Sequence, residues 1–308
     1  MAADVIALDR VTKRYGKTTA LNGLTLSVER GEMFGLIGPD GAGKTTTIRL
    51  ICGLIAADGG GIRVFDLDPV RDHRQLTGSV GYLSQRFSLY GDLSVDENIA
   101  FFAEIHGMRD YAARRDRLLE LTQLAPFRTR LADRLSGGMK QKLALACTLV
   151  HEPDLIVLDE PTTGVDPMSR REFWKLLSEF LSQGITIVMA TPYLDEAERC
   201  ARVALLHEGR LLALDRPAAL RATLPGQLVE VIVRDHRRAF DVLRRVPGVS
   251  DVQMFGERAH VRVAGDQHDA PGRLATMLQA AGLDVAMVRP IPTSLEDVFI
   301  ARLDEARS

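Results

Sequence analysis

One glycine-rich run carries the residues best suited to bind a polyphosphate. In order, its residues are Gly38, Pro39, Asp40, Gly41, Ala42, Gly43, Lys44, Thr45 and Thr46. They match the spacing GxxxxGK[ST] between an apolar strand pattern at residues 33–38 and a helical pattern that reaches Cys52. In this setting the backbone N–H groups face the phosphates, Lys44 reaches the β- and γ-phosphates, and the Thr45 hydroxyl can bind Mg²⁺. A glycine-rich turn without a nucleotide is the alternative, and the lysine and threonine in register argue against it.

Two adjacent carboxylates end a second apolar strand pattern. Residues 155–158 are apolar, and Asp159 and Glu160 follow them directly. Charge is costly beside a buried strand, and successive strand side chains point to opposite faces, so the two acids can serve different tasks. We expect Asp159 to hold Mg²⁺ through its water shell and Glu160 to act as the general base on the attacking water. A solvated strand end with incidental acids is the alternative.

A second candidate anion site lies at Ser136, Gly137 and Gly138, which open a helical pattern that runs to about residue 150. Serine is a favoured N-cap, and the two glycines expose N–H groups at the positive end of the helix. Taken alone, this sequence also fits an ordinary cap. Because one chain then has two phosphate-binding helix ends, we expect a head-to-tail dimer with ATP between the two partners, which are either two copies of this chain or this chain and a different one.

Apolar strands alternate with longer helical patterns through about residue 215, which predicts a mainly parallel sheet covered by helices. Before them, residues 6–8 and 24–28 alternate as antiparallel strands do. Residues 93–135 are helical and rich in arginine, so we expect an inserted helical subdomain there.

After Pro217 the pattern changes to strand, helix, two strands, helix and strand, followed by a final helix near residues 294–303. This order predicts a small ferredoxin-like α+β domain. We therefore divide the chain into residues 1–220, with the nucleotide site, and residues 221–308, an accessory domain without a catalytic cluster.

Composition sets the remaining bounds. The chain has 308 residues, a net charge of -2, 46% apolar and 26% charged residues. It has no overall basic footprint, so nucleic acid is not the expected partner. It begins without a signal-peptide pattern and its apolar runs are shorter than a membrane span, so we expect a cytoplasmic protein. The separated Cys52, Cys147 and Cys200 are expected to be reduced core thiols.

These motifs, in this order over about residues 4–215, resemble the ATP-binding cassette (ABC) family. The resemblance implies a P-loop NTPase fold, ATP hydrolysis with Mg²⁺, and a second cassette as partner. It also implies that Tyr15 stacks on adenine, Gln85 joins the Mg²⁺ shell and assists catalysis, and Asp166 links the two sites. Without the resemblance, Tyr15 is a half-buried strand aromatic and Gln85 a loop amide.

One position departs from the family pattern. Pro192 stands where the family usually has a histidine that touches the γ-phosphate. Proline has no side-chain donor and no titratable group. Either Glu160 suffices for turnover, or hydrolysis is slow.

Residues 87–99 and 292–299 resemble exporter subunits that work with a separate polytopic ABC-2-type membrane subunit. The resemblance implies a peripheral position on the inner face of the cell membrane and a docking segment at residues 85–97. Drug-like molecules, lipids and polysaccharides all stay open as cargo, because a motif does not identify it. Two other functions stay open. One is a regulatory cassette with little turnover, which Pro192 favours. The other is a non-transport ATPase that acts on nucleic acid or ribosomes, although such a protein usually has two cassettes in one chain.

Overall fold

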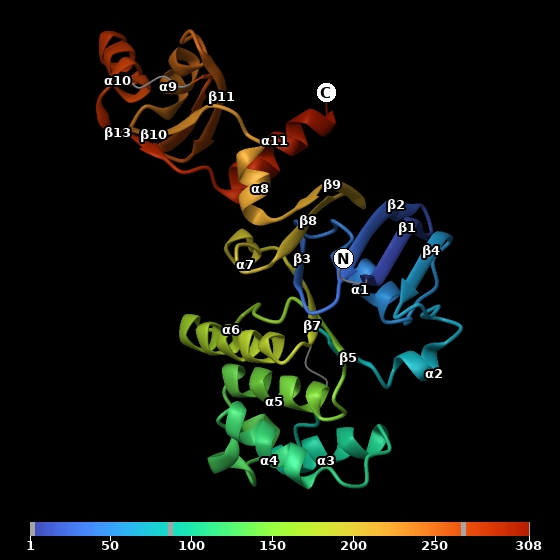
Figure 1. Ribbon diagram of the computed structural model, residues 1–308. Coiled ribbons are helices and arrows are strands. Elements are labelled where there is room, and N and C mark those ends of the chain that lie inside the picture. Colours follow the sequence, from blue (N-terminus) through green and yellow to red (C-terminus); the bar gives the residue numbers. More distant parts are fainter. Residues whose placement is uncertain (1–3, 86–88, 266–268, 308) are drawn as a thin grey trace. The chain divides into compact units, whose positions relative to one another are not determined.

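The computed structural model describes residues 4–85, 89–265 and 269–307. By their contacts these residues form two compact units. The first runs through Pro217 and includes the segment that begins at Arg302, and the second is Ala218–Ala301. Figure 1 shows the elements of both units in sequence colours.

A six-stranded sheet forms the centre of the first unit. Its strand order is β5-β6-β7-β3-β8-β9, with all neighbours parallel except the antiparallel pair β8 and β9. Every residue of β3, β6 and β7 is buried, as expected for strands covered on both faces. The bounds are β3 (Met33–Ile37), β5 (Val80–Leu83), β6 (Leu155–Asp159), β7 (Thr186–Thr191), β8 (Arg202–His207) and β9 (Arg210–Asp215). The predicted mainly parallel sheet is thus confirmed.

An antiparallel sheet of order β2-β1-β4 packs beside it, built from β1 (Asp4–Tyr15), β2 (Thr18–Glu29) and β4 (Gly59–Val64). Leu8 pairs with Leu26 on one side and with Ile62 on the other. The apolar faces of both sheets and helix α1 (Lys44–Ile51) share one buried core. This core holds the strand–helix turn between β3 and α1 in place.

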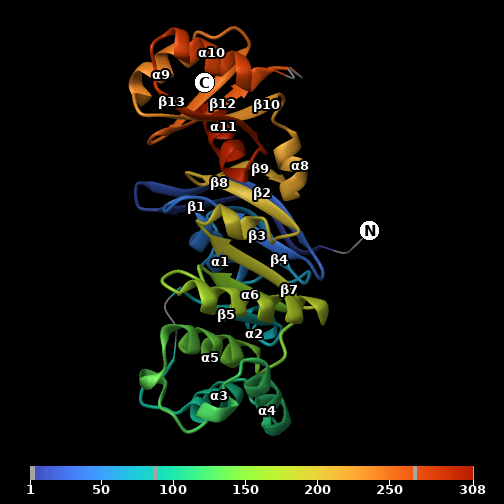
Figure 2. The ribbon, with the colours of Figure 1, turned by 90° about the vertical axis from the view of Figure 1, so that its left-hand side faces the viewer.

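A stack of helices follows β5 in the chain. It contains α3 (Val95–Ile105), α4 (Ala112–Leu121), two short 3-10 turns (Ala125–Phe127 and Ala132–Arg134), α5 (Gly137–Leu149) and α6 (Pro167–Ser182). Figures 1 and 2 both show α5 between α6 and the pair α3 and α4. Arg128 connects two of these helices, because it forms salt bridges with Asp96 of α3 at 3.0 Å and with Asp116 of α4 at 2.8 Å. Residues 93–135 are thus largely helical, and acidic side chains of the same region neutralise part of their arginine charge.

The second unit contains a four-stranded antiparallel sheet of order β11-β12-β10-β13, with helices α9 and α10 between its strands in the chain. Alternate residues of β10, namely Val229, Val231 and Val233, form a core of their own with Ala239 and Leu274. The bounds are β10 (Gln227–Val233), α9 (His236–Leu243), β11 (Val249–Phe255), β12 (Arg258–Val263), α10 (Ala270–Ala280) and β13 (Val285–Ile291).

The described residues also form the helices α2 (His73–Leu76), α7 (Leu194–Ala197), α8 (Pro217–Ala222) and α11 (Leu295–Arg307). None of the helices in the described ranges is long and apolar enough to cross a membrane. The cysteines Cys52, Cys147 and Cys200 are free and buried, as predicted.

Candidate nucleotide site

The phosphate loop lies at the carboxyl end of β3, between that strand and α1. Gly43 is the N-cap residue of α1 and has a φ of 103°. A Cβ there would lie 2.6 Å from Leu21 Cδ2 and 2.8 Å from the Ala20 carbonyl oxygen, so glycine is required by both conformation and space. The strand–loop–helix setting that the spacing predicts is therefore present.

Lys44 is directed into this loop. Its side chain is 4% exposed, and its Nζ donates to Gly38 O at 2.8 Å and to Pro39 O at 3.1 Å. The same nitrogen lies 3.4 Å from Glu160 Oε1. A buried cation is thus held between the loop carbonyls and the candidate general base.

Asp159 and Thr45 meet beside the start of α1. The Thr45 hydroxyl donates to Asp159 Oδ1 at 3.0 Å. Burial raises the pKa of the Asp159 carboxyl, while the hydrogen bond from Thr45 opposes the increase and the charge of Glu160 adds to it. A hydroxyl and a carboxylate oxygen at this separation are the hard ligands that Mg²⁺ takes in proteins, so the donor set fits the predicted metal.

Glu160 has an unusual backbone. Its φ is 49°, in the left-handed region that non-glycine residues rarely adopt, and its N–H donates to Ala190 O at 2.9 Å. Such a conformation costs about 1–3 kcal/mol and is kept only where the surroundings fix it. The carboxylate accepts from Gln85 Nε2 at 3.2 Å and from the Thr163 hydroxyl at 3.4 Å. Asp159 therefore faces Thr45, while Glu160 faces Lys44 and Gln85.

Ser136, Gly138 and Asp166 form a second group, at the starts of α5 and α6. Ser136 Oγ accepts from Met139 N at 3.3 Å, and Asp166 Oδ1 accepts from Ser169 N at 3.0 Å. A Cβ on Gly138 would lie 2.1 Å from Ser169 Oγ, so the two helix starts are in close contact. Across the described ranges, no hydrogen bond or ion pair joins this group to the phosphate loop of the same chain.

Gln141, to which the sequence motifs assign no role, connects α5 to the segment that follows Glu160. It is fully buried on α5, and its Nε2 donates to the carbonyl oxygen of Pro161, directly after Glu160. A polar residue on a buried helix face, five positions after the Ser136 cap, is the signal that could have found it.

Several of the remaining candidates lie at the surface, among them Tyr15, Pro39, Asp40, Gly41 and Gly137. Tyr15, at the end of β1, is 46% exposed, and Lys13 Nζ lies 5.7 Å from its ring centroid. Asp40 and Gly41 are exposed at the tip of the phosphate loop, which a hydrogen bond from Ala42 N to Pro39 O closes at 3.1 Å. The Tyr15 ring is thus available for stacking.

Pro192 follows the carboxyl end of β7, two residues after Ala190, which binds the Glu160 backbone. The position has neither a backbone N–H nor a side-chain donor to offer. Pro192 therefore donates no hydrogen bond to the candidate base or to a substrate.

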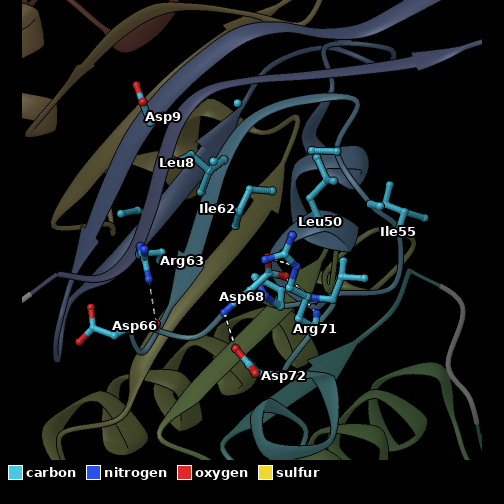
Figure 3. Close-up of a pocket in the computed structure, with 17 residues that line it drawn as sticks. Leu8, Asp9, Leu50, Ile55, Ile62, Arg63, Asp66, Asp68, Arg71 and Asp72 are labelled. Atoms are coloured by element: carbon cyan, nitrogen blue, oxygen red, sulfur yellow. Dashed lines mark hydrogen bonds and ion pairs between the residues drawn. The ribbon is translucent and has the colours of Figure 1, made fainter.

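A cavity of about 980 Å³ lies elsewhere in the first unit (Figure 3), among β1, β4, the end of α1 and residues 66–72. Two of its arginines have local partners. Arg71 lies 3.7 Å from Asp68, and Arg63 donates to the Asp66 carbonyl oxygen at 3.2 Å. None of its lining residues belongs to the phosphate loop or to the two carboxylates, so we do not place the nucleotide there.

A phosphate loop between a central parallel strand and a helix, with two acids at the end of a neighbouring strand, defines a P-loop NTPase. Comparisons with known proteins narrow the class. Residues 21–163 match the family model described as ABC transporter. The chain is 40% identical, over 98% of its length, to the "Probable multidrug ABC transporter ATP-binding protein YbhF" of Escherichia coli (strain K12). It spans about half of that relative, 52% of its length.

Over 97% of both chains it is 38% identical to the "Nod factor export ATP-binding protein I" of Paraburkholderia xenovorans (strain LB400). Among solved structures it is similar to the dimeric "MJ0796, a Bacterial ABC Transporter Cassette", with a TM-score of 0.61 and 27% identity over 68% of this chain and 98% of that one. The chain belongs to the ABC transporter family, among its ATP-binding proteins.

Proposed function

We propose that this chain is the ATP-binding and ATP-hydrolysing subunit of an exporter that works with a separate ABC-2-type membrane subunit. The observation that carries the proposal is the meeting of Lys44, Glu160 and Gln85 at one end of the parallel sheet, next to Thr45 and Asp159. The names of the relatives, one for multidrug transport and one for Nod factor export, support the direction of transport. The cargo is a drug-like molecule, a lipid or a polysaccharide.

In this proposal the loop of residues 38–46 binds the phosphates through its backbone N–H groups, and Lys44 supplies a positive charge to them. Thr45 and Asp159 would hold Mg²⁺, with Gln85 as a further member of its shell, and a bound Mg²⁺ would supply positive charge next to the phosphates. Tyr15 stacks on the adenine from the exposed end of β1.

Glu160 accepts the proton of the attacking water. Its Oε2 takes a hydrogen bond from Gln85 and its Oε1 faces Lys44, so the carboxylate has a fixed orientation. A base that is held in this way avoids reorganisation at the moment of reaction.

The second cassette completes the site. Ser136, Gly137 and Gly138 of one chain face the phosphate loop of the other, and Asp166 links the two sites. Two features support this arrangement: the absence of any bond from Ser136 to its own phosphate loop within the described ranges, and the dimeric state of the similar MJ0796 cassette.

Pro192 favours a second candidate, a regulatory cassette that binds ATP with little turnover. In either case we propose slow basal hydrolysis, because a preorganised donor at this position is missing. The two candidates differ in whether a cycle of hydrolysis accompanies export.

The docking segment for the membrane subunit is residues 85–97, of which 86–88 lie outside the described residues. Tyr90 in this segment is 46% exposed, and its ring contacts Phe101 with centroids 4.5 Å apart. An exposed aromatic side chain beside the start of α3 can serve as the contact for a short helix of the membrane subunit.

Co-purification of the full chain from solubilised membranes tests the proposal. A polytopic protein in stoichiometric amount is the expected result, and Tyr90→Ala should weaken its capture while leaving basal hydrolysis unchanged. Met277→Ala is the matched control, because Met277 is similarly exposed, at 39%, but lies on α10 of the second unit. Recovery of ribosomes or nucleic acid in place of a membrane protein would contradict the proposal.

A further inference from the structure

A buried carboxylate outside the motifs lies beside the candidate base. Glu196, on the short helix α7, is 1% exposed. Its Oε1 accepts from the Thr162 hydroxyl, and its Oε2 accepts from the Thr191 hydroxyl at 2.7 Å. We name these three residues the Glu196 clasp.

The clasp joins two loops that the chemistry needs. Thr162 lies two residues after Glu160, and Thr191 directly precedes Pro192. The Thr191 oxygen also accepts from the N–H of Tyr193 at 3.1 Å, so the turn around Pro192 is fixed from both sides. One side chain therefore sets the separation of the two loops.

These hydrogen bonds and the backbone together form a closed circuit. The Glu160 N–H donates to Ala190 O at 2.9 Å, and Thr191 follows Ala190 in the chain. The Glu196 carboxylate then accepts from the hydroxyls of both Thr191 and Thr162. Glu160 lies within this circuit with its left-handed φ of 49°. A strained residue keeps its conformation only when its neighbours hold it, and the clasp holds the segment that directly follows it.

Burial of this carboxylate is costly, which argues that its role exceeds packing. A carboxylate taken out of water needs charged or hydrogen-bonding partners, and an apolar side chain often packs as well at lower cost. Glu196 has two hydroxyl donors and, at 3.8 Å, the guanidinium of Arg170. Arg170 lies on α6, whose N-cap is Asp166, so the clasp also contacts the helix that follows the proposed link between the two sites.

We infer that Glu196 is a positioning residue for Glu160, acting through the hydroxyls of Thr162 and Thr191. It keeps the general base and the Pro192 turn at the separation that hydrolysis requires. This inference rests on the proposed ATP hydrolysis.

The test compares Glu196→Gln, Glu196→Leu, Thr162→Val and Thr191→Val in the full chain, measuring ATP affinity and phosphate release. Glu196→Leu should lower kcat by about 10²-fold, the typical effect of a displacement of roughly 1 Å, with the KM for ATP nearly unchanged. Glu196→Gln retains one acceptor oxygen and an amide that can donate to a rotated hydroxyl, so it should rescue most of the loss. The two threonine variants, which keep the glutamate and change little volume, should each lower kcat by a smaller factor.

A double-variant comparison separates positioning from general loss of structure. If Glu196 acts through Glu160, adding Glu196→Leu to Glu160→Gln should not lower the residual rate further. Glu230→Gln is the matched control: Glu230 is also buried, at 4%, and pairs with Arg289 at 2.8 Å in the second unit. This control should change thermal stability without changing kcat.

If the wild type hydrolyses ATP and kcat is unchanged in Glu196→Leu and in both threonine variants, this inference is overturned and the proposed function is not. A further loss in the double variant would also overturn it, because the effect would then not pass through Glu160. A wild type that binds ATP without hydrolysing it would overturn both the proposed turnover and this inference.

Discussion

Replacing Pro192 by histidine is the change with the clearest expected gain. Thr191, before it, is held by the β7–β3 pairing with Ile37 and by its hydrogen bond to Glu196. Proline normally restricts the residue that precedes it, but here these contacts fix Thr191 independently. The substitution therefore adds an imidazole without releasing the loop.

The size of the gain follows from the missing donor. Loss of one preorganised donor to developing charge typically costs about 2.7–4 kcal/mol, or roughly 10²–10³ in rate. Lys44 already lies 3.4 Å from Glu160 and supplies part of the local positive charge. We therefore expect the lower end, about 10²-fold in kcat, with ATP affinity nearly unchanged because the new bond forms mainly in the transition state.

The assay is steady-state phosphate release at saturating Mg-ATP, together with equilibrium ATP binding, for wild type, Pro192→His and Pro192→Ala. Alanine removes the proline ring without adding a donor, so it isolates the backbone effect. The reasoning is refuted if the wild type already turns over several times per second, a typical enzyme rate, and Pro192→His is no faster than Pro192→Ala.

Three further predictions concern other parts of the chain. Glu160→Gln should bind ATP and accumulate as a dimer in light scattering at saturating Mg-ATP, because the binding groups remain while the base is lost; a nucleotide-bound monomer would argue against the shared site. His151 stacks on His106 with ring centroids 3.7 Å apart, and burial, followed by the charge of His106, lowers the pKa of His151 to about 4. The unfolded chain then binds more protons than the native chain between pH 6.5 and 4, so stability falls as the pH falls through this window, and His151→Phe should reduce the loss by at most about 3 kcal/mol in denaturant titrations. Asp297 is fully buried and accepts from Ser294 N at 2.8 Å, so Asp297→Asn should lower the unfolding free energy by about 1–3 kcal/mol in thermal melts, with unchanged ATP affinity.

Patterns among residues that are close in the sequence correctly predicted several strands and a helix start of the first unit. The strand patterns at residues 33–38 and 155–158 coincide with β3 (Met33–Ile37) and β6 (Leu155–Asp159), and the Ser136 cap precedes α5 as expected. These features depend on neighbouring residues in the chain, so periodicity and capping rules detect them. The antiparallel pairing of β1 and β2 was also predicted correctly, although both strands extend well beyond the short segments identified.

Long-range contacts could not be predicted in the same way. The hydrogen bond from Gln141 to Pro161 joins residues 20 positions apart, and the bond from Thr162 to Glu196 in the clasp joins residues 34 positions apart. A glutamate on a short helix next to an acidic neighbour looks solvent-exposed in sequence, and only the packing of α7 against the sheet buries it. The left-handed backbone conformation of Glu160 could not be predicted either, because positive φ is usually associated with glycine or asparagine.

Single-turnover hydrolysis of Mg-ATP by the full chain tests the central claim most directly, with wild type compared against Glu160→Gln. If Glu160 is the general base of an ATP-hydrolysing subunit, both proteins bind ATP with similar affinity, and phosphate release falls by about 10²–10⁴-fold in the variant. Equal rates of phosphate release in the two proteins would contradict the account.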